Sequence, residues 1–184
     1  MAGDDSMQLR AQKVSFFSRN VRQMYLEAFP SEERMPFPAM VAMPKLWHTD
    51  FLEFYDGDTL CGFVYLAHNC KMGFIMFLAV DEVLRSKGYG SEILHEIQRR
   101  YSDEKMIVSI EPCDEDAPDL ARRAKRKAFY SRNGYRETGY RMRLSGVEQE
   151  ILIGNGEFDQ KEFRLFFALY SNGIVCPKIW REDT

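Results

Sequence analysis

The residues best suited to chemistry lie in Val80–Ser91, where an apolar stretch gives way to a glycine-containing turn. Arg85 and Lys87 are cationic, and Gly88 and Gly90 are spaced to open a helix. A helix N-terminus offers N–H groups that have no partner within the helix, together with the positive end of the helix dipole. Glycines let an anion approach that backbone closely. The segment therefore predicts a phosphate or pyrophosphate site built largely from main-chain groups.

Two familiar phosphate motifs do not describe this segment. It lacks the Gly-x-x-x-x-Gly-Lys-Ser/Thr pattern of a P-loop. It contains Gly-x-Gly, but Ile93 stands where the dinucleotide fingerprint has its third glycine. What remains is Arg-x-x-Gly-x-Gly after an apolar strand.

This pattern, formed by Arg85, Gly88 and Gly90, resembles the acyl-CoA signature of the GNAT superfamily, the acyl-CoA-dependent N-acyltransferases. In that family, Arg/Gln-x-x-Gly-x-Gly/Ala joins the fourth strand to the third helix. A second likeness follows later in the chain, where Tyr130 and Gly134 match a Tyr-x-x-x-Gly-Phe pattern that often ends the family's fourth helix. The two motifs stand in the family's order within a mixed α/β context.

The resemblance extends from Phe51 to roughly Arg143 and leaves both ends of the chain outside it. One position departs from the family pattern. Seven residues before Tyr130 the family frequently has Asn, and here that position is Arg123. Whether this position holds the cofactor or an ordered water is therefore open.

The resemblance implies main-chain roles for two groups of residues. Backbone groups of the splayed fourth strand would bond the pantetheine arm, and an N–H there would polarise the thioester carbonyl. The following loop would hold the pyrophosphate of acetyl-CoA, the expected co-substrate; no metal is expected. The alternatives are a plain core strand and an ordinary turn. The strand residues are Leu78, Ala79 and Val80, and the loop residues are Arg85, Ser86, Lys87, Gly88, Tyr89, Gly90 and Ser91.

Tyr130 is the predicted general acid. Breakdown of the tetrahedral intermediate expels a thiolate whose conjugate acid has a pKa near that of Cys, about 8.5, and a phenol with a pKa of about 10 can protonate it. The alternative is an aromatic side chain that only packs between helix and sheet, as is expected of Phe129.

The acceptor amine must lose a proton before it can attack, and Glu111 is the first choice as base. It stands at the carboxyl end of a buried strand, directly before Pro112, where partial desolvation can raise a carboxyl pKa. Three alternatives remain open. The first is that Glu111 only caps a helix. The second is that ordered water serves as base, and the third is that Glu32 or Glu33 in the proline-rich loop takes the proton.

An acidic loop precedes a basic helix. One alternative is a solvated helix face with local charge balance; the other places part of the helix against the adenosine 3′-phosphate while the loop attracts a cationic amine. The acidic residues are Glu111, Asp114, Glu115, Asp116 and Asp119, and the basic residues are Arg122, Arg123, Lys125, Arg126, Lys127 and Arg132.

The elements that must position these residues follow from hydrophobic spacing and from Pro and Gly. Helices are expected over Phe16–Phe29, Gly88–Tyr101, Asp119–Asn133 and Asp159–Tyr170, with Ile93, Leu94 and Ile97 as the buried stripe of the second. A loop covers Pro30–Pro38, with room for a short helical turn after it. Strands are expected over Phe51–Tyr55, Leu60–Ala67, Met72–Val80, Met106–Ile110, Tyr135–Leu144 and Gln149–Ile153. The order predicts a mixed α/β fold with one twisted sheet flanked by helices.

Composition fits a single globular domain over residues 1–184, with a core of about residues 8–144 and a strand–helix extension over 145–184. The net charge of −3 argues against a dedicated nucleic-acid binder. The longest apolar run, Phe74–Val80, is too short to span a bilayer, and no secretory signal is visible. The four cysteines form no C-x-x-C pair, which favours reduced thiols in the cytoplasm.

The predicted function is acetyl transfer from acetyl-CoA to a primary amine by direct attack, since no Cys has an obvious His–Asp partnership. The acceptor, a small molecule or a peptide, is open. The alternative is a catalytically silent acyl-CoA-binding sensor that keeps the loop and is indifferent to Tyr130. The C-terminal segment either closes over the site or forms a homodimer surface.

Overall fold

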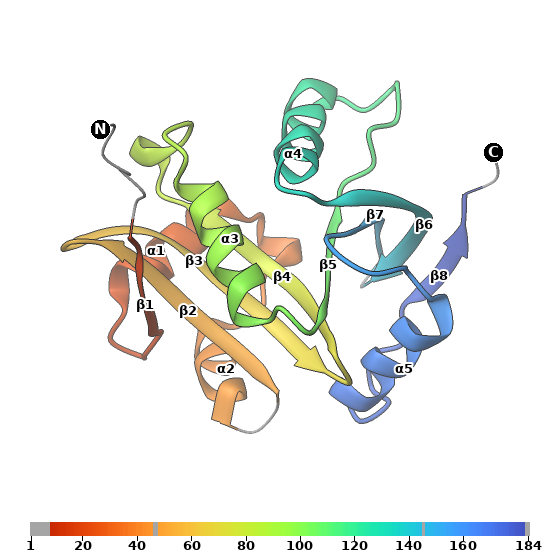
Figure 1. Ribbon diagram of the computed structural model, residues 1–184, viewed down its shortest axis with the longest axis horizontal. Helices are drawn as coiled ribbons and strands as arrows, with labels where there is room; N and C mark the ends of the chain where they lie inside the picture. Colours follow the sequence, from red (N-terminus) through yellow and green to blue (C-terminus); the bar gives the residue numbers. More distant parts are fainter. Residues whose placement is uncertain (1–7, 46–47, 145, 183–184) are drawn as a thin grey trace, which may run out of the picture. The chain divides into compact units, whose positions relative to one another are not determined.

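The computed structural model describes residues 8–45, 48–144 and 146–182, which form eight strands, five α-helices and three 3₁₀ turns (Figure 1). The strands are β1 (Arg10–Lys13), β2 (Thr49–Asp56), β3 (Thr59–Asn69), β4 (Met72–Val80), β5 (Lys105–Ile110), β6 (Arg136–Leu144), β7 (Val147–Ile153) and β8 (Lys178–Arg181). The α-helices are α1 (Arg19–Ala28), α2 (Phe37–Ala42), α3 (Tyr89–Arg100), α4 (Leu120–Arg132) and α5 (Gln160–Tyr170). The 3₁₀ turns are η1 (Ser31–Glu33), η2 (Met43–Lys45) and η3 (Glu82–Leu84).

The strands form one mixed sheet in the order β1-β2-β3-β4-β5-β7-β6-β8. β4 and β5 pair in parallel, with Met72–Ile75 opposite Lys105–Val108. The pairs β1–β2, β5–β7, β6–β7 and β6–β8 are antiparallel. A parallel pair needs a crossover connection, and α3 provides it. The predicted fold class is confirmed.

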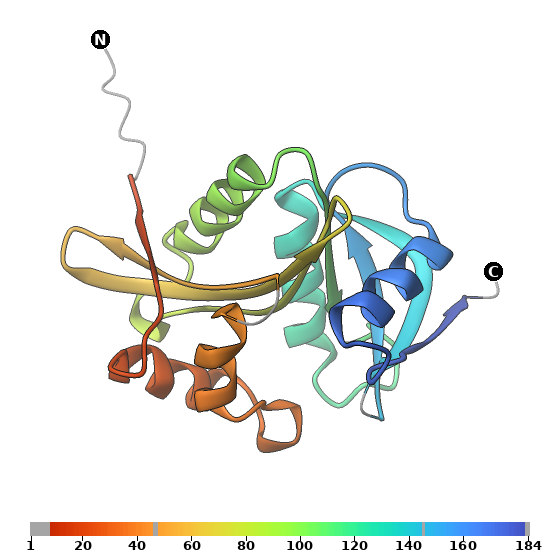
Figure 2. The ribbon, with the colours of Figure 1, turned by 90° about the horizontal axis from the view of Figure 1, so that it is seen from below.

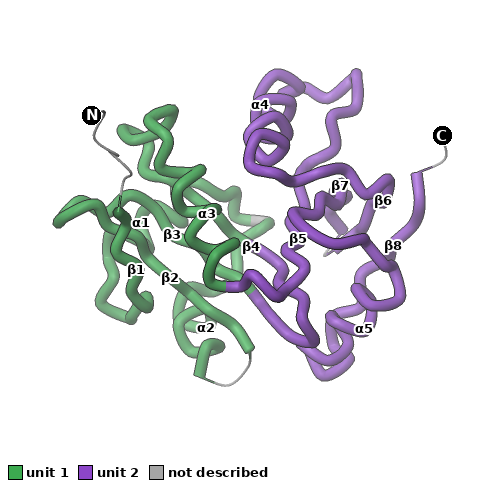
Figure 3. The backbone as a smooth tube through the Cα atoms, in the orientation of Figure 1, with its two compact units in different colours: residues 1–66, 77–100 green, residues 67–76, 101–184 purple. Residues whose placement is uncertain are grey.

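The chain forms two compact units (Figure 3). The first comprises Met1–Leu66 with Phe77–Arg100, and the second Ala67–Met76 with Tyr101–Thr184. The division passes through strands β3 and β4. The residues after position 145 belong to the same unit as β5, α4 and β6. The single domain expected over residues 1–184 stays a prediction.

In the first unit, α3 covers one face of the strands and α1 and α2 cover the other (Figure 2). The predicted stripe of α3 is confirmed, because Ile93, Leu94 and Ile97 have no exposed surface. Opposite it lies an aromatic core in which the Tyr25 ring stands 5.2 Å from that of Phe77. This burial is the main force that holds α3, and hence the loop before it, against the strands.

The first helix is shorter than predicted. It begins at Arg19, not at Phe16, and Phe17 is 88% exposed in the preceding turn. There the Ser15 N–H donates to Ser18 Oγ (3.1 Å) and the Phe17 N–H donates to Ser15 Oγ (3.2 Å). Serine hydroxyls that bond nearby main-chain groups compete with helix formation, and periodicity alone does not reveal this competition.

Two strands were not expected from the sequence. β1 has the polar sequence Arg-Ala-Gln-Lys and β8 has Lys-Ile-Trp-Arg, and they are the two edge strands of the sheet. Edge strands are half solvated and show weak hydrophobic alternation, so their pairing depends on the neighbouring strand. The short helix α2 begins at Phe37, inside the predicted Pro30–Pro38 loop and not after it, and the η1 turn also lies inside that loop.

The second unit has its own aromatic core, in which the Phe163 and Phe167 rings of α5 lie 5.6 and 5.4 Å from the Phe74 ring. Asp159 caps α5 by accepting from the Lys161 and Glu162 N–H groups. The other predicted elements agree with the structure to within about two residues at each end. Among the helices of the described residues, none is long and apolar enough to cross a membrane.

Candidate active site

The predicted pyrophosphate loop follows β4 in the first unit. The Asp81 N–H donates to the Cys61 carbonyl of β3 (2.9 Å), and Asp81 Oδ1 accepts from the Val83 N–H (3.0 Å). The chain then turns sharply, with Ser86 at φ +65° and Gly88 at φ +94°. Positive φ is uncommon for a residue with a side chain and natural for glycine, which explains why the motif needs glycine at position 88.

The turn delivers the chain into the N-terminus of α3. Ser91 and Glu92 donate their N–H groups to the Gly88 carbonyl, at 2.9 and 3.2 Å. The N–H groups of Tyr89 and Gly90, which precede them, have no acceptor within the helix. Free N–H donors and the positive end of the helix dipole are the features that attract an anion, and the pyrophosphate site at this place stays a prediction.

Side chains around this helix start leave the backbone accessible. Arg85 and Lys87 are exposed, and Arg85 Nε lies 3.4 Å from the Val80 carbonyl at the end of β4. The Tyr89 hydroxyl donates to Asp56 Oδ2 (2.7 Å), which raises the pKa of Tyr89 and ties the helix start to the end of β2. The loop is thus fixed at both ends within one unit.

The three predicted strand residues immediately precede this loop. Ala79 is buried, while Leu78 and Val80 are half-buried. The end of β4 therefore leads directly through the η3 turn into the N-terminus of α3.

Tyr130, the predicted acid, lies on α4 in the second unit and is 7% exposed. Its ring stands 5.1 Å from that of Phe129 and 5.4 Å from that of Tyr135. Burial raises the pKa of Tyr130 to about 12, so the phenol keeps its proton throughout the neutral range. Among the described residues the Tyr130 hydroxyl has no hydrogen-bond partner, which leaves the proton available to a bound molecule.

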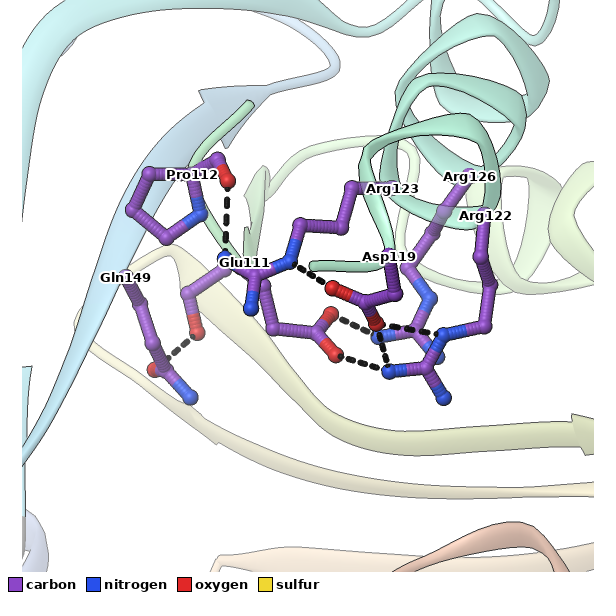
Figure 4. A network of polar contacts seen from close by, with 8 residues as sticks. Glu111, Pro112, Asp119, Arg122, Arg123, Arg126 and Gln149 are labelled. Carbon is purple, nitrogen blue, oxygen red and sulfur yellow. Dashed lines mark hydrogen bonds and ion pairs between the residues drawn. The ribbon is translucent and has the colours of Figure 1, made fainter. Parts of the chain in front are cut away.

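Glu111, the predicted base, lies directly after β5, and its side chain is 17% exposed. Oε1 lies 3.4 Å from Arg122 Nη2, and Oε2 accepts from Arg126 Nη1 (Figure 4). Both oxygens therefore face guanidinium groups of α4. The Arg122 contact is the weaker of the two, because it is long and this arginine also pairs with Asp119.

Arg123, at the position where the family often has Asn, bonds both to Asp119 and to the main chain next to Glu111. Its Nε donates to Asp119 Oδ1 (2.6 Å), and its Nη1 donates to the Pro112 carbonyl (2.9 Å) (Figure 4). Arg123 thereby fastens the start of α4 to the end of β5. The sequence predictions assigned no role to this clamp, although Asp119 stands three and four residues before Arg122 and Arg123, a spacing that favours ion pairs on a helix.

Most of the charge in this region is balanced internally. Asp114 bonds Arg141 (2.7 Å), which holds the pKa of Asp114 below its ordinary value. Lys127 bonds Glu137 (2.9 Å) and the buried Glu150 (2.8 Å). Of the two alternatives for the basic helix, these ion pairs favour local charge balance. They give less support to a helix face that binds the 3′-phosphate.

The thiols give no support to a covalent acyl-cysteine route. Burial raises the pKa of both Cys61 and Cys113, which keeps these thiols protonated and poorly nucleophilic. The alternative bases lie in the first unit. Glu33 ends the η1 turn, whereas the side chain of Glu32 lies outside the described residues.

The comparisons with known proteins bear on this arrangement. Residues 47–137 match the model of the acetyltransferase (GNAT) domain, and this match includes both motifs. The chain belongs to the GNAT superfamily. The family assignment supports acyl-CoA-dependent acetyl transfer as the general activity. A comparison with curated proteins finds no match.

Solved GNAT structures share the fold. A protein from Bacteroides thetaiotaomicron assigned to the GNAT acetyltransferase family is 18% identical with a TM-score of 0.73, covering 90% of this chain and 99% of its own. An acetyltransferase from Bacillus subtilis in complex with CoA is 15% identical (TM-score 0.57; 81% and 99% covered). A GNAT family acetyltransferase from Elizabethkingia anophelis with acetyl-CoA bound is 12% identical (TM-score 0.58; 80% and 98% covered). At these identities the likeness concerns the fold.

Proposed function

We propose that the protein is an N-acetyltransferase that moves the acetyl group of acetyl-CoA to a primary amine by direct attack. The observation that carries the proposal is the β4–α3 loop. Its positive-φ turn at Gly88 brings the first N–H groups of α3 directly after the strand end, and this arrangement supports the binding of a pyrophosphate there. Acetyl-CoA supplies a thioester, which an amine can attack without a covalent enzyme intermediate.

In this proposal the loop holds the pyrophosphate, and main-chain groups of Leu78, Ala79 and Val80 hold the pantetheine arm. An N–H of that strand end donates to the thioester oxygen as negative charge develops on it. Hydrogen bonds of this kind act through the backbone, so they are compatible with the burial of the Ala79 side chain.

Tyr130 protonates the departing thiolate. Its hydroxyl is suited to this step because it is neutral at physiological pH and has no partner among the described residues. The raised pKa makes Tyr130 a weaker acid than an exposed tyrosine. Because the pKa of the thiol is about 8.5, complete transfer of the Tyr130 proton to the thiolate is uphill, so the hydroxyl assists departure first by donating a hydrogen bond to the sulfur as negative charge develops there.

Glu111 accepts the proton of the amine. Arg122, which lies 3.4 Å from Oε1, already pairs with Asp119, so its long contact to Glu111 is the one that an incoming amine would displace. An ammonium group that approaches Glu111 would replace one cation by another, so the local charge balance is kept. Ordered water is the alternative base, and the pH profile described in the Discussion separates the two.

An acceptor panel tests the proposal. Purified protein is incubated with acetyl-CoA and, in turn, an amino sugar, a polyamine, a peptide with a free N-terminus, lysine and an amino-acid analogue, and released thiol is recorded. Turnover with at least one amine is expected, together with CoA binding in calorimetry. Binding without turnover on any acceptor would favour the silent acyl-CoA sensor, and absence of binding would refute both readings.

A further inference from the structure

Gly62 of β3 lies unusually close to the strand end that the proposed function assigns to the pantetheine arm. A Cβ atom at this position would lie 2.4 Å from the Ala79 carbonyl oxygen and 2.9 Å from Ile93 Cδ1. Ordinary contact begins at about 3.4 Å, so a methyl group would be about 1 Å too close to the oxygen. The φ angle of Gly62 is not in the left-handed region, and the restriction is therefore one of space and not of backbone conformation.

The two atoms that a Cβ at position 62 would meet differ in how easily they can move. Ile93 Cδ1 is the far end of a flexible side chain, whereas the Ala79 oxygen is part of the β4 backbone. That backbone is pinned two residues later, because the Asp81 N–H donates to the Cys61 carbonyl next to Gly62 (2.9 Å). A side chain at position 62 therefore requires a shift of main chain, and a rotation or displacement of the Ala79 peptide group is the shift that relieves the contact directly.

The same peptide group carries the Val80 N–H. A peptide unit is rigid and planar, and in the trans form its C=O and N–H point in opposite directions. No cis peptide bond occurs in the described residues. Because the Ala79 oxygen faces Gly62, the Val80 N–H faces away from β3. Any rotation that relieves a clash at position 62 must turn this donor by the same angle.

We propose that Gly62 is a positioning residue for acyl transfer: its missing side chain sets the direction in which the Val80 N–H points toward the acyl-pantetheine. The inference rests on the proposed function. It concerns the pantetheine end of the co-substrate only, since the anion site at the start of α3 is held separately by Gly88 and by the Tyr89–Asp56 bond.

The test compares Gly62→Ala with Gly73→Ala. Gly73 is also in a close contact, but an added Cβ there would meet Met106 Sδ at 2.6 Å, the end of a flexible side chain. Gly62→Ala is expected to lower kcat/KM for acetyl-CoA by about 10- to 100-fold, as expected for a 1 Å misplacement of a transition-state donor. Its affinity for adenosine 3′,5′-bisphosphate, which lacks pantetheine, should stay within about twofold of the wild type. Gly73→Ala should leave both quantities unchanged.

A second variant separates the two contacts of Gly62. In Gly62→Ala/Ile93→Val the clash with Cδ1 is removed and the clash with the Ala79 oxygen stays. The loss of kcat/KM should persist. Recovery to the wild-type value would overturn the proposal, because it would mean that crowding against Ile93 is the whole effect. This double variant also serves if Gly62→Ala does not fold.

Amide NMR of the wild-type protein adds a measurement that depends on no variant. The Val80 amide signal is expected to shift with acetyl-CoA and to stay in place with adenosine 3′,5′-bisphosphate. An unmoved signal with acetyl-CoA would overturn the proposal even where catalysis is intact. If the wild type neither binds CoA nor transfers acetyl groups, the proposed function itself has failed. Normal wild-type turnover with an unimpaired Gly62→Ala refutes only the role of Gly62.

Discussion

The β4–α3 loop of the first unit and the β5–α4 region of the second make opposite use of side chains. In the loop, the proposed binding groups are main-chain N–H donors, and the cationic side chains Arg85 and Lys87 are exposed. In the β5–α4 region the proposed groups are side chains whose surroundings decide their chemistry. Tyr130 is buried, and Glu111 is paired with arginines. A site made of backbone depends on space, whereas a site made of side chains depends on burial and charge.

The largest effect is expected where bulk and charge enter the backbone site. Gly90→Glu should weaken CoA binding by at least about 100-fold, because a carboxylate would occupy the position of a phosphate. The fold should persist, since Gly90 is only half-buried at the start of α3. Calorimetry with CoA measures the loss, and Gly90→Ala, which adds bulk without charge, is the control. Unchanged affinity in Gly90→Glu would remove the basis for the cofactor site.

The next effect concerns the buried side chain. Tyr130→Phe removes only the hydroxyl and should lower kcat by about 100-fold with little change in CoA affinity. Because the pKa of Tyr130 is about 12, the wild-type rate should show no decline due to this residue between pH 8 and about pH 11. Tyr135→Phe, the same change in the neighbouring ring, should keep kcat near that of the wild type. Equal turnover in the two variants would make Tyr130 a packing residue.

A smaller effect is expected at the paired carboxylate. Glu111→Gln should lower kcat/KM at neutral pH, and the rate should recover at high pH, where free amine is abundant and needs no base. Acetyl-CoA binding should be unaffected. Glu115→Gln, in the exposed part of the same acidic loop, is the control for net charge. A neutral-pH rate equal to that of the wild type would assign the role of base to water or Glu33. Loss of CoA affinity would mean that Glu111 mainly holds Arg122 and Arg126 in place.

The smallest effect is expected at Arg141, in the second unit, and it concerns the free energy of unfolding. Arg141 pairs with Asp114 (2.7 Å), Glu148 (3.0 Å) and Glu182, and its side chain is 18% exposed. Its hydrogen bonds are the largest cause that lowers the pKa of Asp114 and Glu148 from their ordinary values of 3.8 and 4.5. Arg141→Gln should cost about 1 kcal/mol at neutral pH, because its partners are solvent-screened.

The pH dependence has a definite sign. Carboxyl groups whose pKa is lowered by folding contribute stability above their ordinary pKa values and lose it as pH falls through the lower folded values. The difference in free energy of unfolding between Arg141→Gln and the wild type should therefore be largest near pH 7 and shrink below about pH 4. Arg143→Gln removes a single ion pair, to Glu148 (2.9 Å), together with a ring contact to Trp180 that does not depend on pH, and it should show a smaller pH-dependent difference. A difference that is constant with pH would contradict the assigned role of Arg141.

Sequence reasoning predicted the inner strands and the longer helices well, but it missed both edge strands and placed the start of α1 too early. β4 was placed at its observed bounds, because its apolar run has no other plausible location than the centre of a sheet. β1 and β8 were not expected, since edge strands carry little hydrophobic pattern. The start of α1 was placed too early, because the serine hydroxyls that hold Phe16 and Phe17 in a turn leave no periodic signal.

The sequence by itself determined the family and the turn between β4 and α3, because this turn depends on local backbone geometry that two glycines and a helix start specify within a few residues. It determined neither the clamp of Arg123 on Pro112 nor the pairing of Glu111 with two arginines, since these contacts join residues eleven or more positions apart. Only the tertiary structure decided the environment of Tyr130 and the space at Gly62. Both depend on how elements that are far apart in the sequence pack against one another, and the spacing of residues along the chain does not specify this packing.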